Sequence, residues 1–506
     1  MKKSKLLKIA PLIASTVLAV PVVAVSCSDK KDNKKTPLTV DDWDAKVKCG
    51  DVTCYFYCYS DGTAQLVDAD NDDGILIVPA TVYDSWRNIT CRVTTIRNLP
   101  SRGSVDGIKF KNAYFLRRIE DYAFKDWKFE GCHCDLDFTN TQLEYVGVQA
   151  FTNCIYYNYS DIYSPENLVQ SIRFPKTIRT ISDYAFSTPN THDYHCICVG
   201  RIDFLTDNEE DIKKITFGKK WTTKRVDTDD TVHDEYLQYE TIANVPAGCA
   251  NLYKNLPNFI YEDKEKYITW YSIDYINEKE SLGYLDGRVS CLCKDVWCDF
   301  DCYSDGTAVL MECGNNHGTL EVPATVKYNN REYKVTDIQS VRTNNTVKKV
   351  DGISFRKATN LKYIWQYAFY GFSFEGKTTD MELSYTKLEI IGCCAFGNVM
   401  NSNNGEYAMN DGYMKFPETV KWFGNGAFHA WVPKKFDYPM QFKNVYFTQS
   451  DPDKIAQIYF HKFWGTLSSI SSSSGCTFHI PTEAALEAYK ARENFNYYDC
   501  KLVVGS

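Results

Sequence analysis

The sequence predicts a repeat solenoid rich in β-structure, arranged as two tandem copies. Three observations support this fold class. A set of motifs recurs in the same order in both halves of the chain. A short apolar spacing occurs six times within those halves, and β-type triplets separate its occurrences. Because no such short unit buries its apolar face alone, neighbouring units must stack.

The tandem duplication is visible as co-linear pairs of segments. Residues 51–64 return as 295–308, 78–82 as 322–326, 106–110 as 351–355, and 129–131 as 374–376. Matches in one order over this length predict two copies of one module, at residues 45–285 and 286–506.

Each copy begins with the pattern of a β-hairpin. Aromatic and cysteine side chains fill residues 55–59 before Ser60-Asp61-Gly62, and the second copy has Phe300, Cys302 and Tyr303 before Ser304-Asp305-Gly306. An Asp-Gly pair between alternating segments favours a tight primed turn, because glycine tolerates a positive φ. We therefore expect an N-terminal hairpin cap on each copy.

Six segments share one spacing: an apolar residue, another three positions later, and Ala-Phe at positions seven and eight. Their Ala-Phe pairs are residues 123–124, 150–151, 185–186, 368–369, 395–396 and 427–428. A spacing of three then four residues also suits an amphipathic helix. However, the segments are short, and triplets such as Ile108-Lys109-Phe110 flank them. We therefore expect solenoid coils, each with a short strand, a turn and an Ala-Phe anchor that fills the interior.

The end of the second copy carries the composition of a helix. Residues 483–489 are rich in Ala, Glu and Leu and follow Pro481-Thr482. We expect a C-terminal helical cap on each copy, covering the edge of the last coil, which would otherwise pair with another chain.

These motifs resemble the BspA-like leucine-rich repeat family. The resemblance rests on Leu-x-x-Ile-x-x-x-Ala-Phe and on further matches at residues 60–96, 174–178, 244–254, 304–338, 416–420 and 480–490. It covers most of residues 50–500. It implies an irregular leucine-rich repeat solenoid and adhesion to host extracellular matrix or other surface partners.

The first 26 residues have the pattern of an export signal. Lysines precede an apolar run over residues 9–25, and the small residues Ala24-Val25-Ser26 stand directly before Cys27. The alternative is a permanent transmembrane helix. The run is barely long enough for that, and its two prolines weaken a helix further.

The sequence around Cys27 resembles a bacterial lipobox, most closely that of surface lipoproteins from wall-less, mycoplasma-type bacteria. The usual Leu three places before the cysteine is Ala24 here. The resemblance implies that Cys27 becomes the mature N-terminus and carries acyl chains, two of which give stable anchoring. Residues 27–44 would then include a charged tether. An ordinary cleavage site and a secreted protein are the alternative, and either route places the chain outside the cytoplasm.

The charge balance and composition exclude two classes of protein. Lys and Arg number 57 against 65 Asp and Glu, for a net charge of −8, which argues against a nucleic-acid binder. Hydrophobic residues make up 44% and charged residues 24% of the chain, as in ordinary globular proteins, so the chain is not disordered throughout.

The cysteines are the first candidates for covalent chemistry. Of 20 in the chain, removing Cys27 leaves an odd number, so full internal pairing is impossible. Three positions recur in both copies: Cys49 with Cys293, Cys54 with Cys298, and Cys58 with Cys302. They are either disulfide partners outside the cell or reduced thiols in the core.

Metal ligands are present but in unsuitable patterns. The clusters Cys132-His133-Cys134 and 192–198 match no standard zinc module. The carboxylates of residues 68–73 resemble a calcium loop, but Gly74 comes one place late and the second copy has lost most of them. We expect no metal and no cofactor.

Enzyme motifs are absent from the sequence, including the nucleophile elbow, the zinc-protease helix, the phosphate loop and the dinucleotide fingerprint. Asp227, Asp229 and Asp230 could form an acid–base pair, but a charged loop explains them better.

The sequence therefore favours a non-enzymatic, lipid-anchored surface protein that binds an extracellular protein or glycan. A surface hydrolase and a nutrient-capturing lipoprotein are the alternatives. The sequence does not identify the ligand, the contact residues or the oligomeric state.

Overall fold

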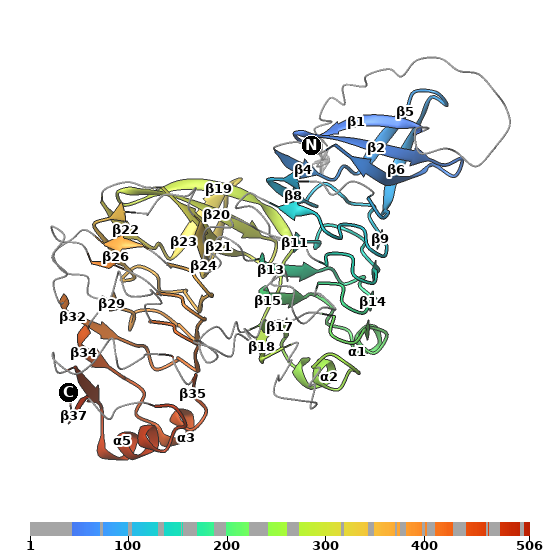
Figure 1. The fold of residues 1–506 in the computed structure, drawn as a ribbon. Coiled ribbons are helices and arrows are strands. Elements are labelled where there is room, and N and C mark those ends of the chain that lie inside the picture. The colour runs from blue at the N-terminus through green and yellow to red at the C-terminus, as the bar shows by residue number, and fades with distance from the viewer. Residues whose placement is uncertain are drawn as a thin grey trace, which may run out of the picture.

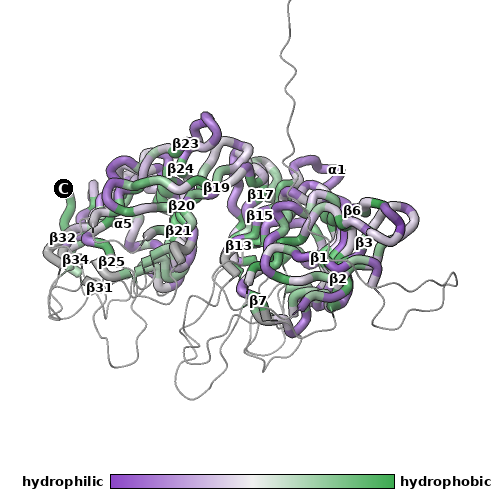
Figure 2. Tube along the Cα trace, turned by 90° about the horizontal axis from the view of Figure 1, so that it is seen from above, coloured by the Kyte–Doolittle hydropathy of each residue, from purple (hydrophilic) through white to green (hydrophobic). Residues whose placement is uncertain are grey.

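Short strands stacked coil upon coil build two solenoid arrays that lie side by side, in both the front view and the view from above (Figures 1 and 2). The computed structural model describes residues 43–70, 74–99, 104–129, 136–152, 154, 169–186, 199–221, 241–260, 273–314, 318–342, 349–369, 372–374, 381–396, 400–401, 410–428, 442–461, 464, 476–495 and 500–505. We call the part up to Lys279 the N-terminal array and the part from Leu285 the C-terminal array.

The N-terminal array contains a nine-stranded long sheet and a five-stranded side sheet. The long sheet comprises β1 (Ala45–Cys49), β2 (Val52–Cys58), β3 (Thr63–Ala69), β5 (Thr81–Asp84), β6 (Ile89–Ile96), β9 (Arg118–Ile119), β12 (Tyr145–Val146), β14 (Thr180–Ile181) and β16 (Thr216–Phe217). The side sheet comprises β11 (Leu136–Asp137), β13 (Val169–Phe174), β15 (Val199–Phe204), β17 (Ile242–Pro246) and β18 (Tyr275–Lys279). Outside these sheets lie β4 (Ile75–Ile77) with β8 (Gly107–Lys109), β7 (Ser104–Val105) with β10 (Lys128–Phe129), and the helices α1 (Glu209–Ile212) and α2 (Ala250–Lys254).

The C-terminal array repeats this strand order in its own long sheet and side sheet. The long sheet comprises β19 (Leu285–Cys293), β20 (Val296–Tyr303), β21 (Thr307–Cys313), β23 (Thr325–Tyr328), β24 (Arg331–Arg342), β27 (Tyr363–Ile364), β30 (Ile390–Ile391), β33 (Trp422–Phe423) and β35 (Tyr459–Phe460). The side sheet comprises β29 (Met381–Glu382), β32 (Asn410–Lys415), β34 (Phe442–Tyr446), β36 (Thr477–Ile480) and β37 (Lys501–Val504). The remaining elements are β22 (Thr319–Glu321) with β26 (Gly352–Ser354), β25 (Lys349–Val350) with β28 (Ser373–Phe374) and β31 (Met400–Asn401), α3 (Pro452–Ile455) and α5 (Glu483–Lys490).

The predicted coils are confirmed, and each contains one strand more than expected. Arg118 and Ile119, inside the first Leu-to-Ala-Phe segment, form the strand β9, which pairs in parallel with β12 of the next coil. Several β-type triplets supply strands of the side sheet, whereas Ile108-Lys109-Phe110 contributes Ile108 and Lys109 to β8, which pairs with β4. From β11 onward the coils add strands to two sheets, and this makes the solenoid.

The Ala-Phe anchors stack along the axis of each array. The Phe124 and Phe151 ring centroids are 5.1 Å apart, and Phe151 lies 5.1 Å from Phe186. The C-terminal array repeats this, with Phe396 5.3 Å from both Phe369 and Phe428. Nearly all of these rings are fully buried, so the anchors form the centre of two hydrophobic cores, one in each array.

The residue before each Ala-Phe pair has a left-handed backbone, which the sequence analysis did not anticipate. The six φ values lie between 50° and 62°, at Tyr122, Gln149, Tyr184, Tyr367, Cys394 and Gly426. Five of the six are not glycine, although this conformation costs an L-residue about 1–2 kcal/mol. It turns the backbone so that Phe151 N–H donates to Ala185 O at 2.8 Å in the next coil. Hydrogen bonds between coils therefore offset the local strain.

The hairpin turns differ from the expected primed type. Of the Asp61-Gly62 pair, only Gly62 has a positive φ, of 76°. Tyr59 N–H donates to Thr63 O at 2.8 Å, so three residues form the loop. This is the geometry of a three-residue hairpin ending in a left-handed glycine, and the prediction of a two-residue primed turn was wrong.

The predicted C-terminal helix forms, but it is not the last element of the fold. The Oγ1 of Thr482 accepts from Ala485 N–H at 3.1 Å and begins α5, whose Leu486 and Tyr489 pack into the core. The chain then continues into β37, which pairs with β36. A strand, not the helix, therefore forms the edge of this side sheet.

Substitutions at Gln149 test the left-handed turn. We expect Gln149→Gly to raise the free energy of unfolding by about 0.5–1 kcal/mol, because glycine removes the strain. We expect the β-branched Gln149→Val to lower it by about 1 kcal/mol or more. Urea unfolding would measure both. The control Gln65→Gly, in the extended strand β3, should lower the free energy of unfolding. If both glycine variants changed this free energy in the same direction, the strain argument would be contradicted.

Candidate binding surface

The outer face of the N-terminal side sheet packs against the C-terminal long sheet. Ile242 on β17 lies in one buried cluster with Tyr363, Trp365, Ile390 and Trp422. The ring of Tyr275, on β18, stacks on that of Trp422 with centroids 4.7 Å apart. This apolar contact is the junction between the two arrays (Figure 1).

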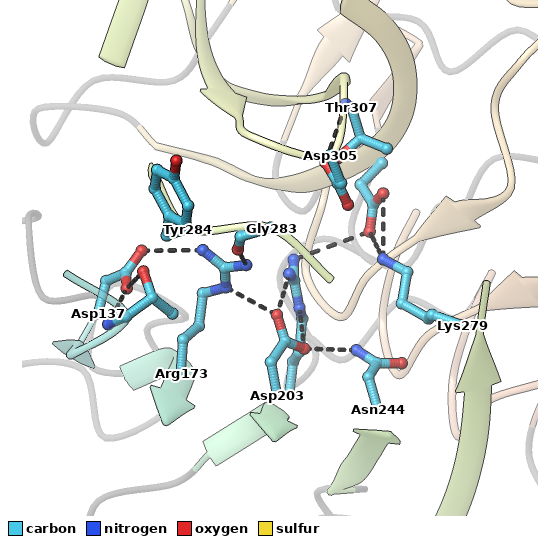
Figure 3. A network of polar contacts seen from close by, with 12 residues as sticks. Asp137, Arg173, Asp203, Asn244, Lys279, Gly283, Tyr284, Asp305 and Thr307 are labelled. Atoms are coloured by element: carbon cyan, nitrogen blue, oxygen red, sulfur yellow. Dashed lines mark hydrogen bonds and ion pairs between the residues drawn. The ribbon is translucent and has the colours of Figure 1, made fainter. Parts of the chain in front are cut away.

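A buried network of charges completes the junction (Figure 3). Asp203 accepts from Arg173 Nε at 2.8 Å, from Arg201 Nε at 2.9 Å and from Asn244 Nδ2 at 2.7 Å. Across the junction, Asp337 accepts from Lys279 Nζ at 3.0 Å. Arg201 Nη1 lies 3.8 Å from the same carboxylate. The arrays are thus joined by largely buried ion pairs.

The network holds its carboxylates ionised. Burial raises the pKa of Asp203, but the Arg201 and Arg173 guanidinium groups outweigh burial, so the pKa lies well below its usual range. Burial acts on Asp337 in the same way, and Lys279 and Arg201 lower the pKa of this group below its ordinary value. Both carboxylates therefore carry a negative charge over the whole physiological pH range.

The corresponding face of the N-terminal long sheet is polar and uncovered. By strand register, Arg118, Tyr145, Thr180 and Thr216 occupy the positions of Tyr363, Ile390, Trp422 and Tyr459. Arg118 lies 4.1 Å over the Tyr145 ring and pairs with Glu120 at 2.8 Å. The same sheet position is thus apolar where it is covered and polar where it faces solvent.

The corresponding face of the C-terminal side sheet is also uncovered, and aromatic residues line it. One row crosses this sheet through Glu382, Lys415, Tyr446, His479 and Val503, at the positions of Asp137, Arg173, Asp203, Asn244 and Asn277 in the N-terminal array. We call this the open row. Its N-terminal counterpart is the buried network of the junction.

Rings and hydrogen bonds order the open row. The Tyr446 and His479 rings stack with centroids 4.1 Å apart and planes 14° from parallel. His479 Nε2 lies 2.9 Å from Asn444 Oδ1, and the Tyr413 hydroxyl donates to Glu382 Oε2 at 2.9 Å. Burial, and then Lys501, lower the pKa of His479, so the imidazole is neutral at pH 7. A half-buried aromatic platform with fixed polar groups suits a protein or glycan contact.

A second exposed apolar feature lies on the first hairpin of the C-terminal array. Leu292 on β19 and Trp297 on β20 are directly opposite each other, and both side chains are 54% exposed. The equivalent N-terminal pair is Lys48 and Thr53. Exposed Trp next to an aliphatic side chain is typical of contact sites.

The six recurring cysteines are buried thiols on the first strands of each array. Cys49, Cys54 and Cys58 lie on β1 and β2; their counterparts Cys293, Cys298 and Cys302 lie on β19 and β20. Burial and then the Cys49 thiol raise the pKa of Cys54 well above its usual value, and burial raises that of Cys302 to about 12. Such thiols are protonated at neutral pH and are weak nucleophiles.

Several sequence-based candidates lie outside the described residues. They are the signal segment with Cys27, the clusters at 132–134 and 192–198, and Asp227, Asp229 and Asp230. The acidic loop is described only through Asp70. Within the part of the chain that the structure describes, no three His, Cys, Asp or Glu side chains are grouped to hold a metal ion, and no helix has the length and apolarity to cross a membrane.

The sequence analysis missed the junction and the open row altogether. A signal was present: the Ala-Phe units align, yet the residues just before them change from Arg118 and Glu120 to Tyr363 and Trp365. A change from charged to aromatic residues at equivalent strand positions indicates that one face is covered.

Replacement of Asp337 tests the junction. We expect Asp337→Asn to lower the free energy of unfolding by about 3 kcal/mol, because the largely buried Lys279 then loses its anion, whereas Arg201 keeps Asp203. The matched control Asp207→Ala breaks an exposed ion pair with Lys176 and should cost at most about 1 kcal/mol.

The difference in the free energy of unfolding between the wild type and Asp337→Asn should depend on pH. A carboxylate with a lowered folded pKa stabilises fully above its unfolded pKa of about 3.9. The difference should therefore be constant above about pH 5 and shrink below about pH 4, as measured by urea unfolding across this range. A difference that grows on acidification would contradict the proposed ion pairs.

The chain was compared with solved structures and with curated proteins. Three solved structures align with the chain at 11% identity each: the pneumococcal vaccine antigen PcpA (TM-score 0.23), a leucine-rich cell surface protein from Faecalibacterium prausnitzii (0.16) and a leucine-rich repeat protein from Bacteroides ovatus (0.14). The alignments cover 92%, 93% and 89% of this chain and 99%, 96% and 98% of the respective structures. No curated protein matches the chain.

One segment of the chain is similar to a known repeat family. The family described as BspA type Leucine rich repeat region (6 copies) matches residues 117–220. This segment contains the coils with Phe124, Phe151 and Phe186, which carried the resemblance seen in the sequence. Residues 117–220 are therefore similar to a BspA-type leucine-rich repeat region, and the stacked coils of the structure agree with the repeat solenoid that the spacing predicts.

Proposed function

We propose that this protein is a cell-surface binding scaffold that attaches to an extracellular protein or glycan. The open row carries this proposal. It places Tyr446 and His479 on the outer face of the side sheet, and Tyr413 beside the row donates to Glu382, so polar groups are already ordered there. A preorganised surface loses little side-chain entropy on binding.

The family match supports the proposal at the level of fold. Leucine-rich repeat solenoids offer extended faces for macromolecular partners. The two modules, residues 45–285 and 286–506, would present separate faces, and simultaneous engagement of both would add avidity.

We further propose that the chain reaches the cell surface as a lipoprotein. The supporting observations are the apolar run over residues 9–25, the small residues before Cys27, and the polar segment that follows. Two acyl chains on Cys27 would hold the scaffold at the membrane, and the tether would keep the arrays clear of it.

Substitution of the aromatic platform tests the binding role. The full chain lacking its first 27 residues would be screened against arrayed matrix proteins and glycans. We expect saturable binding that Tyr446→Ala with His479→Ala weakens at least about tenfold, because central aromatic residues dominate contact energies. Tyr145→Ala, a tyrosine on the other open face, is the matched control. Binding that survives the double variant would remove the open row from the contact, and no binding by the wild type would reject the scaffold role.

Substitution of Cys27 tests the anchor. In cells fed a labelled fatty acid, we expect label on the wild-type protein and recovery of that protein with the membrane. Cys27→Ser should carry no label and should be recovered in the soluble fraction or keep its signal segment. A labelled Cys27→Ser variant would contradict lipidation at this residue, whatever the scaffold binds.

A further inference from the structure

We propose that Cys476 and Cys500 form a disulfide that fastens the last strand of the fold to the C-terminal side sheet. Thr477 of β36 pairs in parallel with Lys501 of β37, so the two cysteines that precede them occupy matching positions. Lys501 N–H donates to Cys476 O at 2.9 Å and holds the two segments together at this point.

Both thiols point to the same side of the sheet. Cys476 is 1% exposed and shares its inward face with Phe478 and Ile480. Cys500 packs against the same core, as do Leu502 and Val504. Matching positions on paired strands lie about 4.8 Å apart, within the range of Cα separations that a disulfide bridges. The Cys500 thiol is the leading cause of the raised pKa of Cys476, as expected for two sulfurs in contact.

The N-terminal array shows what these two positions do without cysteine. Thr241 and Asp274 precede Ile242 and Tyr275, which pair in the same way. Thr241 N–H donates to Asp274 Oδ2 at 2.7 Å, so this array closes the same point with a hydrogen bond. In the C-terminal array both positions hold cysteine, so a disulfide between Cys476 and Cys500 would replace this hydrogen bond.

Two other thiol contacts, each within a single short segment, suit a disulfide less well. Cys393 and Cys394 have sulfurs 3.6 Å apart but are sequence neighbours, and Cys291 and Cys293 lie two residues apart on one strand. Cys291 and Cys293 stand about 6.6 Å apart along one extended strand, so bridging them demands a distorted backbone. Cys393 and Cys394 are adjacent, so their Cα atoms are about 3.8 Å apart, below the usual range for a disulfide. Cys476 and Cys500 occupy matching positions beside paired strands and meet neither difficulty.

The bond forms by thiol–disulfide exchange with an oxidised dithiol or glutathione disulfide. The half-buried Cys500, as thiolate, attacks the oxidant's S–S bond and releases one thiol. Cys476 then loses its proton and displaces the second thiol from the mixed disulfide. One S–S bond forms and one breaks; the two cysteines are oxidised, and the oxidant is reduced to two thiols. The closed loop contains α5, so the cap and the edge strand become one covalent unit.

The test uses the purified full chain without its first 27 residues, incubated with glutathione disulfide and then digested without reductant. We expect one cross-linked peptide pair joining Cys476 to Cys500, lighter by two hydrogen atoms than the reduced pair. Cys500→Ser should leave Cys476 open to alkylation in the denatured chain. Cys249, a buried thiol, is the control and should stay reduced. Failure to cross-link, or a link from Cys500 to another cysteine, would overturn the proposal.

A second measurement reports the consequence of the bond. Amide hydrogen exchange in β37 should be slower in the oxidised than in the reduced wild type, and Cys500→Ser should show no such difference. Equal exchange in both wild-type forms would show that the link does not fasten the strand. In the cell, the inference rests on the proposed export of the chain. The experiment on purified protein tests the disulfide separately from the proposed export and binding, because oxidation in vitro does not depend on where the protein is located or on any binding partner.

Discussion

The stacking of one coil on the next is the interaction on which the rest of the structure depends. Each coil contributes an Ala-Phe anchor, and the ring-to-ring distance of 5.1 Å between Phe124, Phe151 and Phe186 sets the repeat along the axis. The backbone reinforces this repeat, because the left-handed residue before each anchor directs N–H groups toward carbonyls of the next coil. Side-chain packing and hydrogen bonding therefore enforce the same spacing, so one coil is stable only in the presence of its neighbours.

The same framework gives different surfaces in the two arrays. Inward positions keep their apolar character, as Ile119 and Ile364 show, because each coil must fill the same interior. The residue type at outward positions varies, and it depends on whether the position is covered by the other array or exposed to solvent. Asp203 and Tyr446 occupy one site of the side sheet, yet the first is buried in an ion network and the second faces solvent. The surfaces that bind, whether to the other array or to a partner, are thus separate from the residues that make the fold.

Inward-facing residues explain why the coils were predictable from the sequence and much else was not. The spacing of Leu116, Ile119, Ala123 and Phe124 recurs because packing requires it, and it predicted the coils correctly. The additional strand of each coil escaped prediction, because two residues such as Arg118 and Ile119 are too short for periodicity to reveal.

Long-range pairing and unusual backbone conformations account for the other features that could not be predicted from the sequence. The left-handed turns were missed since Tyr122 and Gln149 lack the glycine that marks such a backbone. The junction depends on Arg201 meeting Asp337, residues far apart in the chain, and no local pattern reports that pairing. The open row was missed for the same reason, because its residues come from five strands that only the fold brings together.

The junction joins two different surfaces, the side sheet of one array and the long sheet of the other. Contacts of this head-to-tail kind do not close on themselves, and a chain that presented both surfaces at its ends would add copies without limit into a filament. The free end of the N-terminal array carries Arg118, Thr180 and Thr216 where the C-terminal array carries Tyr363, Trp422 and Tyr459. These polar side chains do not repeat the aromatic surface on which the side sheet packs at the junction, so this face does not offer the same contact a second time.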